Sequence, residues 1–253
     1  MKTEVIGQGE PEIAVVACIH GDEPCGLKAF ERLKRSRIGL NQPVKFILAN
    51  EKAFHRGERY IDRDLNRVFP GDRDSEHHEE RLAARILDEL EGLKVIDFHS
   101  SESPKTPFAL VSGLNEEKYG LARNTCMENL VEISYVEGGM INYLNGVTVE
   151  AGPDASPQSA QMAYHILLNF LAAEDVIDEK FDRSEPEVFE VYDRAEGENY
   201  EFVAENFVQL EKGETYAENR EDVKKASENF CPVLMSTDGY EDMIGFKGKK
   251  KEF

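Results

Sequence analysis

One apolar run, IAVVACI over residues 13–19, is followed directly by the polar motif HGDE over residues 20–23. An unbroken run of β-branched and other apolar residues is typical of a strand buried on both faces of a sheet. The stretches VKFILA (44–49), KVIDF (94–98) and NGVTVE (145–150) predict three more strands. The run at 13–19 is therefore expected to lie at the centre of a sheet, with HGDE at its carboxyl end.

Helical spacing of apolar residues occurs between these runs. The patterns predict helices after residue 24, over residues 75–91, over residues 115–130, and from Ser156-Pro157 onward. Such alternation up to about residue 174 indicates an α/β fold, a mostly parallel mixed sheet flanked by helices. From about residue 182 the pattern changes to short period-two segments such as 187–192 and 200–210. We therefore expect one domain over residues 1–174 and a small β-rich domain over residues 182–253.

The composition restricts the classes of partner. Acidic residues outnumber basic ones 50 to 30 in the 253 residues, a net charge of −20 that would repel nucleic acid. No run approaches the ~18 apolar residues of a membrane span, and no secretory signal begins the chain. Four cysteines without a framework spacing are typical of reduced thiols. We expect a cytoplasmic protein with no nucleic-acid or membrane partner, and the oligomeric state stays open.

Three side chains at strand ends are candidates for a metal site. His20 and Glu23 follow the first buried run, and His99 follows the strand at 94–98. The carboxyl ends of parallel strands meet at one edge of a sheet, where ligands bind. Two imidazoles and one carboxylate suit Zn²⁺ with a fourth position left for water. HxxE alone arises often by chance, so the prediction of one zinc ion per chain depends on His99 joining the pair.

An arginine-rich segment, RYIDRDLNRVFPG over residues 59–71, lies between these candidates. One interpretation is a network of ion pairs with Asp62 and Asp64. The other is that the planar guanidinium groups hold a substrate carboxylate and an oxyanion. Glu150 ends the strand at 145–150, from which it would be able to reach the water on the metal.

Four segments together resemble one enzyme family. HGDE (20–23), RYIDRDLNRVFPG (59–71), DFHS (97–100) and VEAGP (149–153), in this order, are similar to the succinylglutamate desuccinylase/aspartoacylase family, relatives of the zinc carboxypeptidases. The resemblance implies a carboxypeptidase-like α/β catalytic domain followed by a small β domain. It also implies roles for individual residues: zinc ligands His20, Glu23 and His99, general base Glu150, oxyanion stabiliser Arg59, and Asn66 and Arg67 as binders of the substrate carboxylate.

The resemblance is weaker outside these segments. The stretch from Cys231 to Tyr240 is similar to the family segment with a substrate-contacting tyrosine, which would be Tyr240. Aspartoacylase has a second substrate-binding Arg shortly before the catalytic Glu, but residues 138–145 here contain no Arg or Lys. Ser100 stands where aspartoacylase has Asn. These departures leave open whether N-acetylaspartate is a substrate.

The resemblance implies a zinc-dependent deacylase that hydrolyses the amide bond of an N-acyl amino acid or a similar small amide. Its partner would then be a small-molecule substrate. Two alternatives remain. A zinc carboxypeptidase acting on short peptides would use the same ligand plan, and a non-catalytic relative would bind metal or ligand without hydrolysis.

Overall fold

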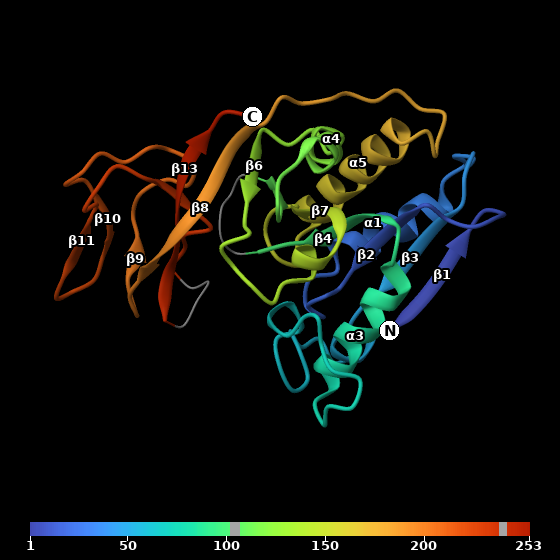
Figure 1. Cartoon of the computed structure of the whole chain (residues 1–253), viewed down its shortest axis with the longest axis horizontal. Coiled ribbons are helices and arrows are strands. Elements are labelled where there is room, and N and C mark those ends of the chain that lie inside the picture. The colour runs from blue at the N-terminus through green and yellow to red at the C-terminus, as the bar shows by residue number, and fades with distance from the viewer. Residues whose placement is uncertain (102–106, 238–241) are drawn as a thin grey trace.

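The computed structural model describes residues 1–101, 107–237 and 242–253. Its main element is a ten-stranded sheet that crosses most of the molecule (Figure 1). The strands, in the order in which they lie side by side, are β1 (Lys2–Ile6), β3 (Val44–Leu48), β2 (Ile13–Ala17), β4 (Lys94–His99), β7 (Asn145–Glu150), β5 (Phe108–Val111), β6 (Asn129–Glu132), β8 (Glu187–Glu196), β13 (Met243–Lys251) and β12 (Cys231–Val233).

Parallel pairing dominates the centre of this sheet. β3, β2, β4 and β7 are mutually parallel, and so are β5, β6 and β8. The antiparallel pairs are β1 with β3, β5 with β7, β8 with β13, and β13 with β12. A second sheet of three strands, β9 (Glu201–Phe202), β10 (Thr215–Glu218) and β11 (Val223–Lys225), lies in the C-terminal part. The predicted fold class is therefore confirmed. The main sheet continues from β6 to β8, so it runs across the division proposed at residues 174–182, which stays a prediction.

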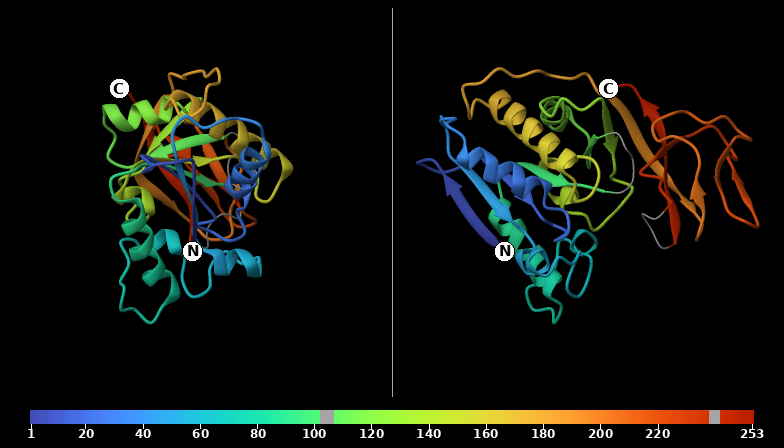
Figure 2. Two further views of the ribbon diagram at one scale, coloured as in Figure 1. Left: turned by 90° about the vertical axis from the view of Figure 1, so that its right-hand side faces the viewer. Right: turned by 180° about the vertical axis from the view of Figure 1, so that it is seen from behind.

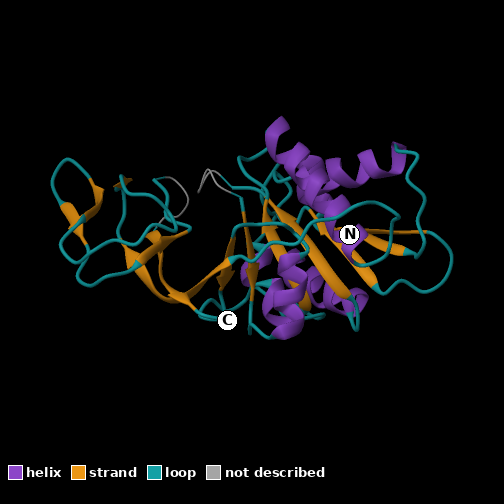
Figure 3. Ribbon diagram, turned by 90° about the horizontal axis from the view of Figure 1, so that it is seen from above, coloured by secondary structure: helices purple, strands orange, loops and turns teal. Residues whose placement is uncertain are grey.

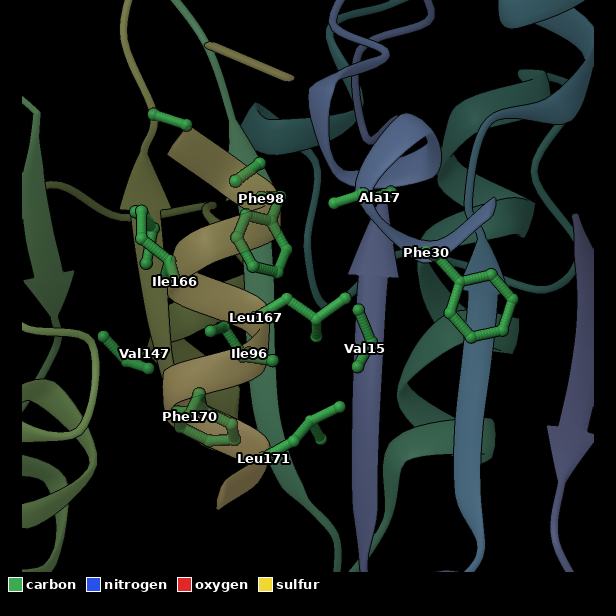
Figure 4. Packing of buried hydrophobic residues seen from close by; sticks show 14 of the residues in the cluster. Val15, Ala17, Phe30, Ile96, Phe98, Val147, Ile166, Leu167, Phe170 and Leu171 are labelled. Atoms are coloured by element: carbon green, nitrogen blue, oxygen red, sulfur yellow. The ribbon is translucent and has the colours of Figure 1, made fainter. Parts of the chain in front are cut away.

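Helices cover both faces of the N-terminal part of the sheet, and the C-terminal part consists of strands and loops (Figure 3). α1 (Cys25–Arg35), α4 (Glu116–Arg123) and α5 (Pro157–Ala173) pack on one face, where their apolar residues form a core with side chains such as Val15, Ile96 and Val147 (Figure 4). α3 (His78–Leu90) packs on the other face against Val16 and Val95. The shorter helical segments are α2 (Glu51–Arg56), η1 (Leu65–Arg67) and η2 (Met140–Tyr143).

Helix boundaries agree with the sequence at the start of α5 and differ at α3 and at the end of α4. Ser156 accepts a hydrogen bond from the Ser159 amide and Pro157 opens α5, as predicted. The predicted helix over 75–91 begins only at His78. The single helix predicted over 115–130 is wrong in its second half, because α4 ends at Arg123 and the chain enters β6. Only β9 forms within the predicted period-two stretch 200–210.

The sheet face that α3 covers also carries the polar side chains of the candidate site. Strand register places Asp97 beside Thr148 and His99 beside Glu150 on β4 and β7. These side chains lie between two apolar clusters on the same face, one under α3 and one shared by β5, β6, β8 and β13. Figure 2 shows, from behind, how the ribbon of β8 and β13 leads from the helical part into the C-terminal strands. No helix among the described residues is long and apolar enough to cross a bilayer.

Candidate active site

His20 and Glu23 lie in the loop that follows β2. The loop turns sharply because Cys18 has a positive φ of 58°. It packs against the backbone of α2, and Gly21 donates its N–H to the Arg59 carbonyl at 3.0 Å. A Cβ on Gly21 would lie 2.3 Å from the Ala53 carbonyl carbon, so only glycine permits this approach. The glycine of HGDE thereby fixes His20 and Glu23 against the segment that begins at Arg59.

The three predicted metal ligands meet. His20 Nδ1 lies 2.7 Å from Glu23 Oε1, and His99 Nδ1 lies 2.9 Å from Glu23 Oε2. One ligand atom of each residue lies within 4.8 Å of those of the other two, and all three residues are buried. Side chains from two strand ends therefore face one point, as the sequence predicts.

A second carboxylate holds each imidazole from behind. His20 Nε2 lies 3.0 Å from Asp64 Oδ1, and His99 Nε2 lies 2.9 Å from Asp97 Oδ2. Burial lowers the pKa of both histidines, but the facing carboxylates outweigh this effect and hold each pKa above its ordinary value. Carboxylates that bind the outer nitrogen of a metal-ligating histidine fix its ring and raise its basicity. Asp97 and Asp64 are suited to that task.

The donor set fits Zn²⁺. Zinc binds nitrogen and carboxylate oxygen at about 2 Å and prefers four ligands. Two inward Nδ1 atoms and a carboxylate within 4.8 Å of one another can share one such ion and leave a position for water. The observation in favour is the orientation of the rings, since both inner nitrogens converge on Glu23 while both outer nitrogens are already engaged.

Glu150 lies beside His99 as its register partner on β7. Its Oε2 atom is buried and has no hydrogen-bond partner within the described residues. Burial, reinforced by the Glu23 carboxylate, raises the pKa of Glu150 to about 7. A buried carboxyl oxygen without a hydrogen-bond partner is costly, and carboxyl groups with a shifted pKa concentrate at functional sites.

The arginine segment supplies the other predicted residues. Arg59 Nη1 donates to Glu23 Oε1 at 2.7 Å, and Arg59 Nε lies 3.6 Å from Asp64 Oδ2. Asn66 lies in η1, where its Oδ1 accepts from the Met140 amide at 3.0 Å, and Arg67 is exposed beside it. Of the two interpretations of the arginine segment, ion pairing with Asp64 therefore applies to Arg59, which also pairs with Glu23. Tyr240 lies outside the described residues.

Sequence reasoning missed Glu79, which organises this segment. It is fully buried in the first turn of α3 and accepts hydrogen bonds from the amides of Ile61, Asp62 and Arg63 at 2.7, 2.9 and 3.2 Å. Asn50 Nδ2 donates to it at 3.1 Å. An acidic residue in the first turn of a helix looks like an ordinary solvated charge, so no sequence signal separates it from Glu80.

The candidate metal ligands and the arginine segment line a cavity of about 770 Å³. Its polar lining includes the candidate metal ligands, Glu150, Arg59, Asn66 and Arg67, and the less expected Asp22, Ser100 and Asp154. A volume of this size is within the range of small-molecule sites. The cavity therefore joins the candidate metal site and the arginine segment in one chamber.

Known proteins share part of the sequence and the fold. Residues 9–127 match the family model of the succinylglutamate desuccinylase/aspartoacylase catalytic domain. The resemblance to this family is thereby confirmed. The succinylglutamate desuccinylase of Pseudomonas aeruginosa strain LESB58 is 32% identical over 111 residues, which is 42% of this chain and 32% of that relative. That of Shewanella pealeana is 27% identical over 124 residues, 46% of this chain and 36% of the relative. The matched part of the chain thus spans about a third of the length of these curated relatives.

Solved structures extend the likeness in fold to the C-terminal part. The succinylglutamate desuccinylase/aspartoacylase of Rhodobacter sphaeroides superposes with a TM-score of 0.79 at 18% identity, covering 99% of this chain and 89% of that one. The product-bound ectoine utilization protein EutE (DoeB) of Ruegeria pomeroyi superposes with a TM-score of 0.73 at 22% identity, covering 97% and 88%. At these identities the structural likeness shows a shared fold.

Proposed function

We propose that this protein is a zinc-dependent hydrolase that cleaves the amide bond of an N-acyl amino acid or a similar small amide. The observation that carries the proposal is the buried, unpaired Oε2 atom of Glu150 beside three converging metal ligands. The family likeness of residues 9–127 supports the same reaction class. A second support is the arginine segment, which lines the same cavity.

His20, Glu23 and His99 would hold the metal. Zn²⁺ bound there supplies a Lewis acid and brings the pKa of a water ligand from about 15.7 to about 7. Asp64 and Asp97 keep the two imidazole rings turned inward. These five residues would bind and orient the metal, and they are not assigned to proton transfer.

Glu150 would act as the general base and then as the general acid. Its unpaired oxygen accepts a proton from the attacking water and afterwards delivers that proton to the leaving nitrogen. A pKa near neutrality suits both steps, because catalysis by an acid or base is most effective when its pKa is close to the working pH.

Arg59 and the η1 segment would handle the substrate. Arg59, released from Glu23, donates hydrogen bonds to the oxygen of the amide carbonyl as negative charge develops there; loss of such a donor typically costs about 10²–10³-fold in turnover. Asn66 and Arg67 would bind the substrate carboxylate and so place the amide carbon, an effect on orientation rather than on the bond-breaking step. Tyr240 is proposed as a further substrate contact.

The first test is Glu150→Gln, with zinc content and hydrolysis of a panel of N-acetyl and N-succinyl amino acids as readouts. We expect zinc to stay bound and turnover to collapse, since glutamine keeps the shape but cannot take a proton. Turnover close to that of the unmodified protein would reject the general-base role.

A companion variant separates the ligands from the base. His99→Ala should lose zinc, as determined by metal analysis, because two ligands hold the ion far less well than three. His55→Ala is a suitable control, since His55 is exposed on α2 and does not line the cavity. Full zinc content in the His99 variant would reject the ligand set.

A further inference from the structure

Part of the cavity wall is apolar. We call it the apolar wall; its residues are Leu110, Ile133, Val136, Ile141, Leu234 and Phe246. Five of them belong to the core cluster shared by β5, β6, β8 and β13, and Val136 packs against that cluster. The wall is therefore the open side of a packed core, which keeps its shape without a ligand.

The apolar wall begins next to the proposed base. Leu110 on β5 is the register partner of Thr148, which lies two residues before Glu150 on β7. Thr148 and Glu150 point to the same face, since side chains alternate along a strand. A substrate whose amide lies at Glu150 would thus extend along β5 toward this wall.

The C-terminal part of the chain completes the wall. Leu234 follows β12 with a positive φ of 53°, a conformation that costs a non-glycine residue about 1 kcal/mol or more. Gly245 on β13 fits against it, because a Cβ there would lie 2.7 Å from the Leu234 carbonyl oxygen. The packing of β12 and β13 holds Leu234 at the cavity despite this cost.

The charges of the cavity favour a substrate with one carboxylate. Among the described residues that line it, Arg59 and Arg67 are the Arg and Lys side chains, against five carboxylic acids: Asp22, Glu23, Asp64, Glu150 and Asp154. Arg59 is proposed above to bind the amide oxygen, which leaves Arg67 for a substrate carboxylate. A second substrate carboxylate lying on the apolar wall would lose its hydration without gaining a partner there, which is unfavourable.

We propose that the apolar wall is a subsite for an uncharged, apolar group of the substrate. The preferred substrates are then N-acyl amino acids that carry one carboxylate and an apolar side chain or acyl chain, rather than dicarboxylates. This inference rests on the proposed function for the name of the substrate class, but the subsite itself is defined by binding.

Calorimetric titration of the zinc-loaded Glu150→Gln protein tests the subsite without consuming ligand. The probes are N-acetylphenylalanine, with an apolar amino-acid side chain, N-hexanoylglycine, with an apolar acyl chain, and N-acetylaspartate. We expect one of the first two to bind about tenfold or more tightly than N-acetylaspartate, and the tighter one tells which side of the amide faces the wall. N-acetylaspartate binding as tightly as both would overturn the proposal.

Val136→Arg places a guanidinium group in the apolar wall at a half-buried position. The affinity ratio should move about tenfold or more toward N-acetylaspartate, the scale on which a pocket discriminates one group from another. Val208→Arg is the matched control, since Val208 is 50% exposed and lies away from the cavity, and its ratio should not change. An unchanged ratio in the Val136 variant counts against the subsite.

The binding and turnover experiments distinguish failure of the subsite from failure of the proposed function. Apolar preference in the titration, together with no hydrolysis by the unmodified protein, would uphold the subsite and reject the proposed function. Hydrolysis that proceeds with no apolar preference would uphold the function and reject the subsite.

Discussion

Glu79 is not a candidate metal ligand, yet three consecutive backbone amides of the arginine segment donate hydrogen bonds to its carboxylate. Burial alone would raise the pKa of Glu79, but these donors and the Asn50 amide outweigh it and hold the pKa below its ordinary value. The positions of Arg59 and Asp64, on either side of these amides, therefore depend on a charge buried beneath them.

Glu79→Gln should lower the free energy of unfolding by about 1–3 kcal/mol, because the amide turns one acceptor into a donor facing backbone N–H groups. Since the folded pKa is depressed, this stabilisation is present above the unfolded value of about 4.3 and is lost as the pH falls through the folded value. Denaturation at several pH values checks both points.

Glu80→Gln is the control for this prediction. Glu80 is the next residue along α3 and pairs with the half-exposed Arg63 at the surface. Its loss should change stability by less than about 1 kcal/mol. Equal effects of the two substitutions would show that the buried acceptor is not what matters.

Among the elements, the loop after β2 and helix α2 approach each other closely at Gly21. Gly21→Ala would put its Cβ 2.3 Å from backbone atoms of Ala53 and Phe54, so the loop must shift. We expect a loss of about 1–3 kcal/mol in stability, as for overpacking elsewhere, and weaker zinc binding. Gly39→Ala, where nothing lies within 4 Å, should leave both measurements unchanged. Zinc titration and denaturation of the two variants decide the matter.

The sequence predicts an element well when its hydrophobic pattern is long, and it predicts a site residue well when that residue directly follows a buried strand. β7 has the predicted limits, and His20, Glu23 and His99 are recognisable because each follows a buried run at the edge where strands of a sheet end. β5 and β6 have four residues each, too few to show a period, and the helix predicted over 115–130 overlaps the first two residues of β6. The apolar wall depends on those two strands and on residues more than a hundred positions away, so no local pattern indicates it.

On the scale of the whole molecule, one core joins the N-terminal part to the C-terminal strands. Phe108 and Leu110 from β5 share a cluster with Phe189 from β8 and Phe246 from β13. Phe108 and Phe189 both contact Phe207, with ring centroids 5.3 and 5.1 Å apart. A change in the C-terminal part is thus expected to reach the cavity through this cluster.

Phe189→Ala tests that expectation, because Phe189 is fully buried where the sheet crosses the proposed division at residues 174–182. We expect a loss of about 3–5 kcal/mol and a single unfolding transition, observed alike by circular dichroism and by tyrosine fluorescence. Two transitions, with only the weaker one displaced, would indicate that residues 1–174 and 182–253 unfold as independent domains.

The pairing of His99 with Glu150 across β4 and β7 links the register of the sheet to the geometry of the candidate site. Shifting β7 by a single place would send the carboxyl group to the side packed by α5 and bring Val149 round in its stead. A chain misaligned in this way would bury the Glu150 carboxylate among apolar neighbours and would also lack the proposed proton acceptor in the cavity. A slip in register would therefore lower stability and displace the proposed base together, whereas a substitution such as Glu150→Gln removes the base alone.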